Sequence, residues 1–413
     1  MSPPSPSSPS PALRPVVGDL LLALVLGVAA YALSCLLVAP EAAAKGFGTQ
    51  WQLMSEAPFE LRGQLPQRLL APLLAHGLGC GGDGYVWFVR GLAVLLLATI
   101  GYYCRRRGAP LVDAALVVIA VAVTAPVQMY KEHWVGYPDA LTYTLCLWLL
   151  LAARRPQLFW LLFFANLLNH ELAVFLLPWL WFVRRRAGGS WRADVVGAGA
   201  ALALYAAFYF WVRATAQQQA YSYDYFAKYP LFPGGTLVVS LMALTHFVVA
   251  FGPVLVVVAW HQHTSRHGRE RWHLWLVLAG MGAIFCIAFD WARHGNLLLL
   301  PLVIASVPFL AAGHRAVYAG LVALGIGLML WIPPWAASAW PIDAMANLPF
   351  WVETGVVQVF PEGGYGSGSL PTVVRNWLPR VAPMLAAIAA IGTAIWLGGL
   401  ALARRRNSNT DTA

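Results

Sequence analysis

The sequence predicts an all-α polytopic membrane protein, and three observations lead to that fold class. Hydrophobic residues make up 60% of the 413 residues and charged residues only 11%, less than half of the roughly 25% that is usual in soluble domains. The apolar residues form long runs, and a helix needs about 20 such residues to cross the ~30 Å hydrocarbon layer. Short arginine clusters separate several runs, which is typical of cytoplasmic loops under the positive-inside rule.

The chain is predicted to form one transmembrane helical domain over residues 15–403. Residues 1–14 are rich in Ser and Pro and predict a disordered cytoplasmic tail, and residues 404–413 form a second cytoplasmic tail. We interpret the first apolar run as an uncleaved anchor. The apolar runs lie at 16–39, 84–104, 109–128, 137–153, 157–183, 193–214, 236–260, 273–289, 297–313, 316–335 and 380–403.

The run at 157–183 decides the topology. Its 27 residues would make a helix of about 40 Å, with the arginines at 154–155 and 184–186 on opposite sides. A hairpin of two short helices that turns at 169–171 instead places 17 of the 27 lysines and arginines in the cytoplasm, against 11 for a single span. The positive-inside rule favours the hairpin. About twelve membrane segments follow, with both termini cytoplasmic and two outer loops, 40–83 and 336–379.

Twelve of the seventeen acidic residues fall on the outer side in this topology. In the first outer loop, Glu60, Arg62 and Arg68 precede or begin a segment, 66–78, whose leucines recur at helical spacing. That pattern predicts an amphipathic helix on the membrane surface with Arg68 on its polar side. The plainer alternative is a juxtamembrane plug with snorkelling arginines.

A second polar cluster, Glu132, His133 and Asp139, forms the tight outer connection between the third and fourth spans. Pro138 suits the first turn of the next helix, where a carboxylate at 139 is favoured by the helix dipole. Helix capping therefore explains Asp139 by itself. Three titratable side chains within eight residues also fit a functional site.

The third and fourth clusters interrupt apolar sequence. His170 and Glu171 follow Asn169 in the middle of the long run, and ionisable residues within a membrane are functional candidates; alternatively, they satisfy the free backbone groups of a turn. Asp290 and Arg293 are at i, i+3 and can pair at a helix end. Either that pair is self-contained, or Asp290 holds Arg293 in place to bind a phosphate.

Other kinds of site find little support in the sequence. The net charge of +10 is spread over short loops without a basic helix, so we expect no nucleic acid partner. Histidines and acids of the outer clusters could bind a divalent cation, but no spacing such as HExxH accompanies them. The sequence therefore assigns no metal ligand. The five cysteines form neither a CxxC pair nor a disulfide framework.

Several blocks resemble the GT-C class of integral-membrane glycosyltransferases. The resemblance rests on an outer loop with Glu56, Glu60 and the surface helix 66–78, and on the charged hairpin NLLNHELAVFLLP. The blocks PQRLLAPLLA, YPDALTY and FDWARHGNLLLLP also look like a set of bacterial membrane proteins that carry them in the same order. The resemblance covers roughly residues 15–335.

This resemblance implies an enzyme of the bacterial cytoplasmic (inner) membrane that takes a sugar from a polyprenyl-phosphate carrier at the outer face. Membrane lipid and a lipid-linked sugar donor would be its partners. Glu60 is the first choice for the catalytic base, with Asp139 and Glu171 as rivals; Arg68 and Arg293 would hold the carrier phosphate. Arg62, Glu132, His133, His170 and Asp290 are expected to border the same outward-facing cavity. Two alternatives stay open, a transporter or lipid flippase and a non-catalytic membrane assembly protein.

Overall fold

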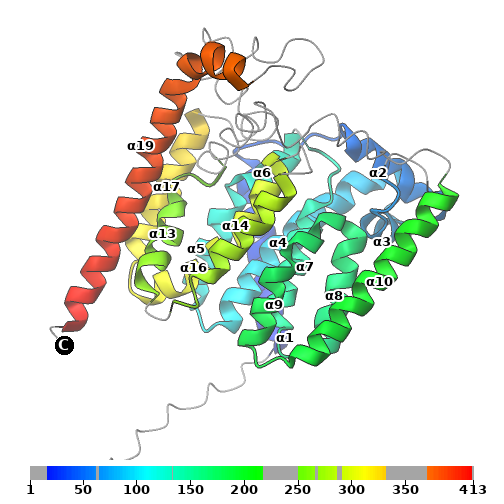
Figure 1. Ribbon diagram of the computed structural model, residues 1–413, viewed down its shortest axis with the longest axis horizontal. Coiled ribbons are helices and arrows are strands. Elements are labelled where there is room, and N and C mark those ends of the chain that lie inside the picture. Colours follow the sequence, from blue (N-terminus) through cyan, green and yellow to red (C-terminus); the bar gives the residue numbers. More distant parts are fainter. Residues whose placement is uncertain are drawn as a thin grey trace, which may run out of the picture.

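The computed structural model describes residues 16–61, 65–132, 134–216, 250–265, 268–285, 291–331 and 370–411, and every regular element in these ranges is a helix. The longer helices pack side by side as a bundle (Figure 1). The elements are α1 Val16–Cys35, α2 Phe47–Glu56, η1 Pro58–Glu60, α3 Leu70–Gly77, η2 Gly82–Gly84, α4 Tyr85–Arg106, α5 Leu111–Ala122, α6 Ala125–Glu132, α7 Asp139–Leu151, α8 Pro156–Asn169, η3 Glu171–Leu176, α9 Leu177–Arg186, α10 Trp191–Thr215, η4 Gly252–Val254, α13 Leu255–Thr264, α14 Trp272–Phe285, α15 Trp291–Gly295, η5 Asn296–Leu298, α16 Leu299–Ala311, α17 Arg315–Trp331 and α19 Leu370–Asp411.

Helix α4 packs against α1, α5 and α7. Its side chains Leu96, Leu97 and Ile100 are fully buried, because their spacing places them on inward-facing sides of a helix that neighbours surround. Gly27 of α1 lies against the backbone of α4: a Cβ atom there would be 2.8 Å from the amide nitrogen of Ala98. Only glycine allows this close approach, as is common where membrane helices cross.

Four helices in the described ranges are long and apolar enough to cross a membrane: Val17–Cys35, Gly82–Arg106, Trp191–Thr215 and Arg293–Ala311. The pair α5 and α6 makes a fifth if it counts as one broken span. Helices α7, α14 and α17 are apolar but shorter, and the 13 residues of α7 extend only about 20 Å. The expected number of about twelve segments is therefore not confirmed, and part of the expected span 236–260 lies outside the described residues.

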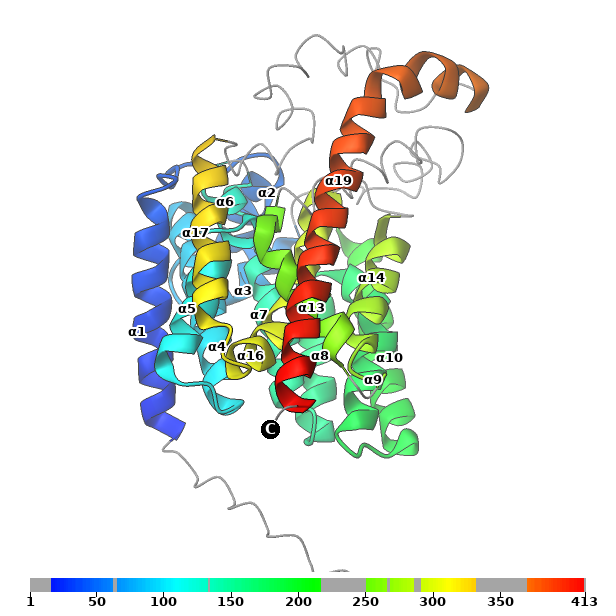
Figure 2. The same cartoon turned by 90° about the vertical axis from the view of Figure 1, so that its left-hand side faces the viewer.

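Helices α1 and α10 lie along the two sides of the bundle (Figure 2) and carry exposed apolar side chains. Val17 and Val25 of α1 are 68% and 64% exposed, and Val196 and Phe210 of α10 are 70% and 69% exposed. Rows of exposed apolar side chains on peripheral helices fit contact with lipid rather than with water.

The expected span 109–128 is broken between α5 and α6, which meet at an angle of 43°. Pro126 explains the break, because it has no N–H to donate to the carbonyl of Ala122 and its ring prevents a continuous helix. The side chain of Gln128 supplies the missing donor, with Nε2 2.6 Å from the Ala122 oxygen. Gln128 is completely buried, so it replaces a backbone hydrogen bond inside the bundle.

Replacing Gln128 with leucine is expected to lower the free energy of unfolding by about 1–3 kcal/mol. The change removes the side-chain donor to the buried Ala122 carbonyl. A buried acceptor that loses its donor costs the full desolvation free energy of that group. Chemical unfolding in mixed micelles, followed by tryptophan fluorescence, measures the effect. The control is Gln52→Leu, at a half-buried position where Nε2 contacts only Asp83 in an exposed hydrogen bond. Equal stability of Gln128→Leu and wild type would contradict this role.

The run 157–183 reverses direction, as the hairpin requires. Helix α8 ends at Asn169, His170 is extended with φ −155° and ψ 109°, and η3 and α9 return along the bundle. The guanidinium of Arg184, near the end of α9, donates to the carbonyl of Ala153, just before α8 begins. The arginines at 154–155 and 184–186 therefore lie at one end of the bundle, which we call the basic end.

The start of α1 also lies at the basic end, because Arg105 at the end of α4 pairs with Asp19 of α1 at 3.1 Å. The C-terminal end of α19 lies at the same end of the bundle in Figure 2. Residues 1–14, predicted to be disordered, fall outside the described residues. The two described ends of the chain are thus on one side of the molecule.

Both expected outer loops differ in part from the structure. The loop 40–83 contains α2 and two 3-10 helices besides α3, and the loop 336–379 ends early because α19 already begins at Leu370. The expected surface helix 66–78 is shorter, Leu70–Gly77. Its protein-facing side consists of Ala71, Pro72 and Ala75, whereas Leu74 and Leu78 are exposed. Small side chains let α3 lie close to the bundle, with Leu70 and Leu73 partly buried against it.

Candidate functional site

Arg68 and Glu171 form a bidentate ion pair at the end of the bundle opposite the basic end. Arg68 lies just before α3, and Glu171 is the first residue of η3, directly after the chain reverses at His170. The Arg68 nitrogens Nε and Nη2 donate to the two carboxylate oxygens at 2.8 and 2.7 Å. The Arg68 guanidinium also lies 5.9 Å from the ring of Trp51, which favours a cation on its face. The first outer loop is thereby tied to the hairpin.

Asp139 and Arg293 form a second bidentate pair. Asp139 is the first residue of α7, where the helix dipole favours a carboxylate, and Arg293 is in α15. Arg293 donates from Nε and Nη2 to the two Asp139 oxygens at 3.0 and 2.8 Å. The Arg293 guanidinium lies over the ring of Tyr137 at 4.5 Å. The hydroxyl of Tyr143 donates to the backbone carbonyl of Arg293 at 2.8 Å. The expected partner of Arg293, Asp290, lies outside the described residues.

His170 lies between the two pairs. Its Nε2 is 3.9 Å from an Asp139 oxygen, and its Nδ1 is 4.0 Å from a Glu171 oxygen. Nδ1 accepts from the backbone N–H of Leu172 at 3.4 Å, so a neutral ring carries its proton on Nε2, facing Asp139. The ring of His294 meets that of His170 edge to face, with centroids 5.2 Å apart. We call this group the paired-arginine cluster: Arg68, Asp139, His170, Glu171, Arg293 and His294.

A small cavity adjoins the cluster. It has room for the centre of about one water molecule, ≈ 10 Å³. Its lining has five side chains with polar groups and is otherwise apolar; the five are Asp139, Thr142, Tyr143, His170 and His294. Asn169 fixes the polar side, because its amide donates to the Thr142 hydroxyl at 2.8 Å and to the Pro138 carbonyl at 3.2 Å. The turn of the hairpin is thus held against the start of α7.

The two pairs differ in access. The side chains of Asp139 and Arg293 are 4% and 2% exposed, whereas that of Glu171 is 23% exposed. A molecule that approaches from outside therefore meets the Arg68–Glu171 pair first. The inner pair lies behind it.

Burial of two ion pairs is not explained by stability alone. Taking charges out of water costs several kcal/mol for each ion, and apolar side chains of similar volume are often as stable or more stable. Anchoring the outer loop and the hairpin accounts for part of the arrangement. Two guanidinium forks, two carboxylates and two imidazoles in one place also match the groups that bind and transfer phosphate-linked substrates.

No protein-family model, curated protein or solved structure matches this chain. The function of the paired-arginine cluster is therefore inferred from the chemistry of its side chains alone. In the described part of the chain, no group of three or more His, Cys, Asp or Glu side chains is arranged to hold a metal ion.

Of the other five predicted site residues, the structure describes two, Glu60 and Glu132. Glu60 is exposed at the end of η1, and Glu132 is half-buried at the end of α6. Arg62 and His133 lie outside the described residues, as Asp290 does. The structure thus brings together Arg68, Asp139, His170, Glu171 and Arg293 from the expected set of ten.

Several residues of the site were not among those predicted. Thr142 and Tyr143 follow Asp139 by three and four positions, which places them beside it on one face of α7, and this spacing could have identified them. His294 adjoins Arg293 in sequence.

Proposed function

We propose that the protein is a bacterial inner-membrane glycosyltransferase that acts on a polyprenyl-phosphate-linked sugar, with the paired-arginine cluster as its reaction site. The observation that supports this most directly is the outer pair, Arg68 and Glu171. A guanidinium fork that binds a carboxylate bidentately has the geometry to bind a phosphate in the same way. One pair therefore contains both an anion binder and a proton acceptor.

The proposed reaction begins with an exchange of partners on Arg68. The phosphate of the carrier takes the place of the Glu171 carboxylate, which is then free to accept a proton. The acceptor hydroxyl oxygen forms a bond to the anomeric carbon of the sugar, and the bond from that carbon to the phosphate oxygen breaks. The electron pair leaves with the phosphate, whose charge Arg68 stabilises. The hydroxyl proton passes to Glu171.

The inner pair has a positioning role in this proposal. Asp139 holds Arg293, and His170 contacts both carboxylates, so the inner charges keep Glu171 and Arg68 oriented at the turn of the hairpin. Arg293 adds a second positive charge toward the carrier phosphate. Glu60, the first choice from sequence, becomes the rival base in this proposal, because its side chain is exposed at the end of η1.

The proposed orientation places the cluster at the extracytoplasmic face. Helix α7 runs from Asp139 in the cluster to Leu151 near the basic end, about 20 Å away at 1.5 Å per residue. The basic end carries the arginine clusters that the positive-inside rule assigns to the cytoplasm. Both termini would then be cytoplasmic, with the reaction site at the opposite surface.

Transfer of label from a radiolabelled polyprenyl-phosphate-linked hexose to envelope acceptors tests the proposal, in membrane vesicles from cells that produce the chain. The variant Arg68→Gln/Glu171→Gln, which removes both charges of the outer pair, is expected to lower transfer at least 100-fold, within the range for loss of a general base. The matched control is Arg184→Gln/Asp194→Asn, a buried ion pair at the basic end with an N–O distance of 2.8 Å.

Activity in the control together with its loss in the outer-pair variant supports the enzyme. Movement of the labelled lipid between leaflets without transfer of the sugar would instead identify a flippase. Full transfer by the outer-pair variant would remove the cluster as the reaction site.

A further inference from the structure

A large cavity among the described residues lies at the basic end, far from the paired-arginine cluster. Its volume is about 760 Å³, within the range of small-molecule sites. It is formed where α4, α7 and α9 end, and α13, α14 and α16 close its other sides. Helix α7 separates it from the cluster, because Asp139 is at one end of that helix and Leu151 lines this cavity at the other.

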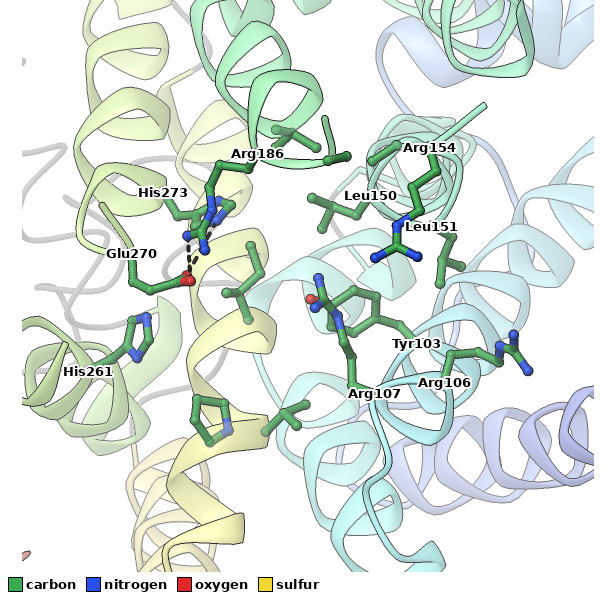
Figure 3. Close-up of a pocket in the computed structure, with 16 residues that line it drawn as sticks. Tyr103, Arg106, Arg107, Leu150, Leu151, Arg154, Arg186, His261, Glu270 and His273 are labelled. Atoms are coloured by element: carbon green, nitrogen blue, oxygen red, sulfur yellow. Dashed lines mark ion pairs between the residues drawn. The ribbon is translucent and has the colours of Figure 1, made fainter. Parts of the chain in front are cut away.

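Positive charge exceeds negative charge in the lining. The described lining residues include four arginines and one carboxylate, Glu270. Glu270 pairs with Arg186, so the charges of Arg106, Arg107 and Arg154 are not balanced by a lining carboxylate. In Figure 3 the guanidinium groups of Arg107 and Arg154 point toward the space beside Tyr103, whereas that of Arg106 points away.

The arginine on the far side is held in place by a chain of contacts. Trp179 donates from Nε1 to Nδ1 of His273 at 3.1 Å, and Nε2 of that histidine is 3.8 Å from a Glu270 oxygen. Glu270 in turn pairs with Arg186. Figure 3 shows Arg186, Glu270 and His273 together, across the cavity from Arg107 and Arg154. These contacts hold the guanidinium of Arg186 in one position. Orientation of the protein in the membrane requires a positive charge in this region but not a fixed position for it.

Apart from the polar side chain of His261, the remaining walls are apolar. Leu150, Leu151, Val183, Ile304, Val307 and Pro308 line the cavity beside the arginines. A free phosphate would contact only the basic side, whereas an amphiphile with a phosphate group would contact both. Basic pockets between membrane helices at the headgroup level of the cytoplasmic leaflet bind anionic lipid headgroups.

We propose that this cavity binds a phosphate ester, with Arg107 and Arg154 on the phosphate and the apolar wall against an attached hydrocarbon part. The positive-inside rule requires arginines in the cytoplasmic loops but does not require them to lie at particular positions. Here they come from separate loops and converge on one hollow that has a single acid in its described lining. The ligand chemistry is therefore that of an anionic phospholipid or of a soluble phosphate ester with an apolar group.

The test measures binding of dioctanoyl phosphatidylglycerol to the purified full-length protein in a neutral detergent, by isothermal calorimetry. The variant Arg107→Gln/Arg154→Gln is expected to lower the affinity at least tenfold. Both side chains are exposed, so the fold should tolerate the change. The matched control Arg155→Gln/Arg185→Gln removes the same charge from the same end at neighbouring exposed positions that are not among the lining residues, and it should stay within twofold of wild type.

Two further ligands separate the sources of the phosphate. Much weaker binding of glycerol 1-phosphate than of the lipid identifies a phospholipid site, whereas equal binding identifies a site for soluble phosphate esters. Dioctanoyl phosphatidylcholine, whose headgroup has no net charge, is expected to bind at least tenfold more weakly than phosphatidylglycerol. An equal loss in the two arginine variants, or no binding by wild type, would overturn the proposal.

Discussion

Replacing Asp139 with asparagine is expected to lower the free energy of unfolding by about 3–5 kcal/mol. The change removes the carboxylate charge that faces the Arg293 guanidinium, whose side chain is 2% exposed, and breaking a buried ion pair on one side has this cost. The variant Asp139→Asn/Arg293→Gln removes both charges and should recover a large part of the loss. Chemical unfolding in mixed micelles measures all three proteins under the same conditions.

The control for Asp139 is Glu41→Gln, which removes an exposed pair with Lys45. Exposed pairs contribute about 0–1 kcal/mol, so this variant should remain close to wild type. A loss below about 1 kcal/mol for Asp139→Asn would show that water reaches the inner pair in the folded protein. Failure of the double variant to recover stability would show that shape and hydrogen bonding, rather than charge balance, hold α15 against α7.

Replacing Arg68 with alanine is expected to weaken binding of the lipid-linked donor by about 1.5–3 kcal/mol, the range for a hydrogen bond to a charged group. That corresponds to about a 10- to 150-fold rise in the dissociation constant. Arg68→Lys keeps the charge and the balance with Glu171 but loses the bidentate fork, so it should retain stability and still bind more weakly than wild type. Fluorescence titration with a labelled polyprenyl-phosphate hexose gives both constants.

The control for Arg68 is Arg192→Ala, an exposed arginine at the start of α10. It removes the same charge and should leave donor affinity unchanged. Unchanged affinity in both Arg68 variants, with normal unfolding behaviour, would limit Arg68 to tying the outer loop to the hairpin.

The sequence predicts the helical class and the reversal at His170 because both depend on local quantities. Composition and run length determine whether a segment is apolar, and charge counting decides on which side the arginines at 154–155 and 184–186 lie. The break at Pro126 also has a local cause, but a hydropathy run of 109–128 passes over it. Helix α2 was not predicted from the sequence because it is short and many of its residues are polar, a pattern that is typical of a loop.

The pairing within the site could not be predicted from sequence spacing. The spacing of Asp290 and Arg293 suggested a local pair, which stays a prediction because Asp290 lies outside the described residues. No spacing suggested that Arg293 also binds Asp139. The partner depends on which helices become neighbours, and tertiary packing rather than periodicity decides that. For the same reason, the predicted loop that holds both Glu60 and Arg68 did not reveal that Arg68 binds Glu171 while Glu60 is exposed.

The distance along the chain between Asp139 and Arg293 has a consequence for biosynthesis. The two residues are 154 positions apart, and at about 5–20 residues per second the ribosome needs about 8–30 s to reach the second after the first. Throughout that interval the nascent chain contains an acidic side chain at the start of α7 whose guanidinium partner has not been made. An ionised carboxylate in the hydrocarbon layer costs about 2.5–3.5 kcal/mol even by permissive insertion scales. The start of α7 is therefore expected to stay near the membrane surface until synthesis of α15 lets the two segments join.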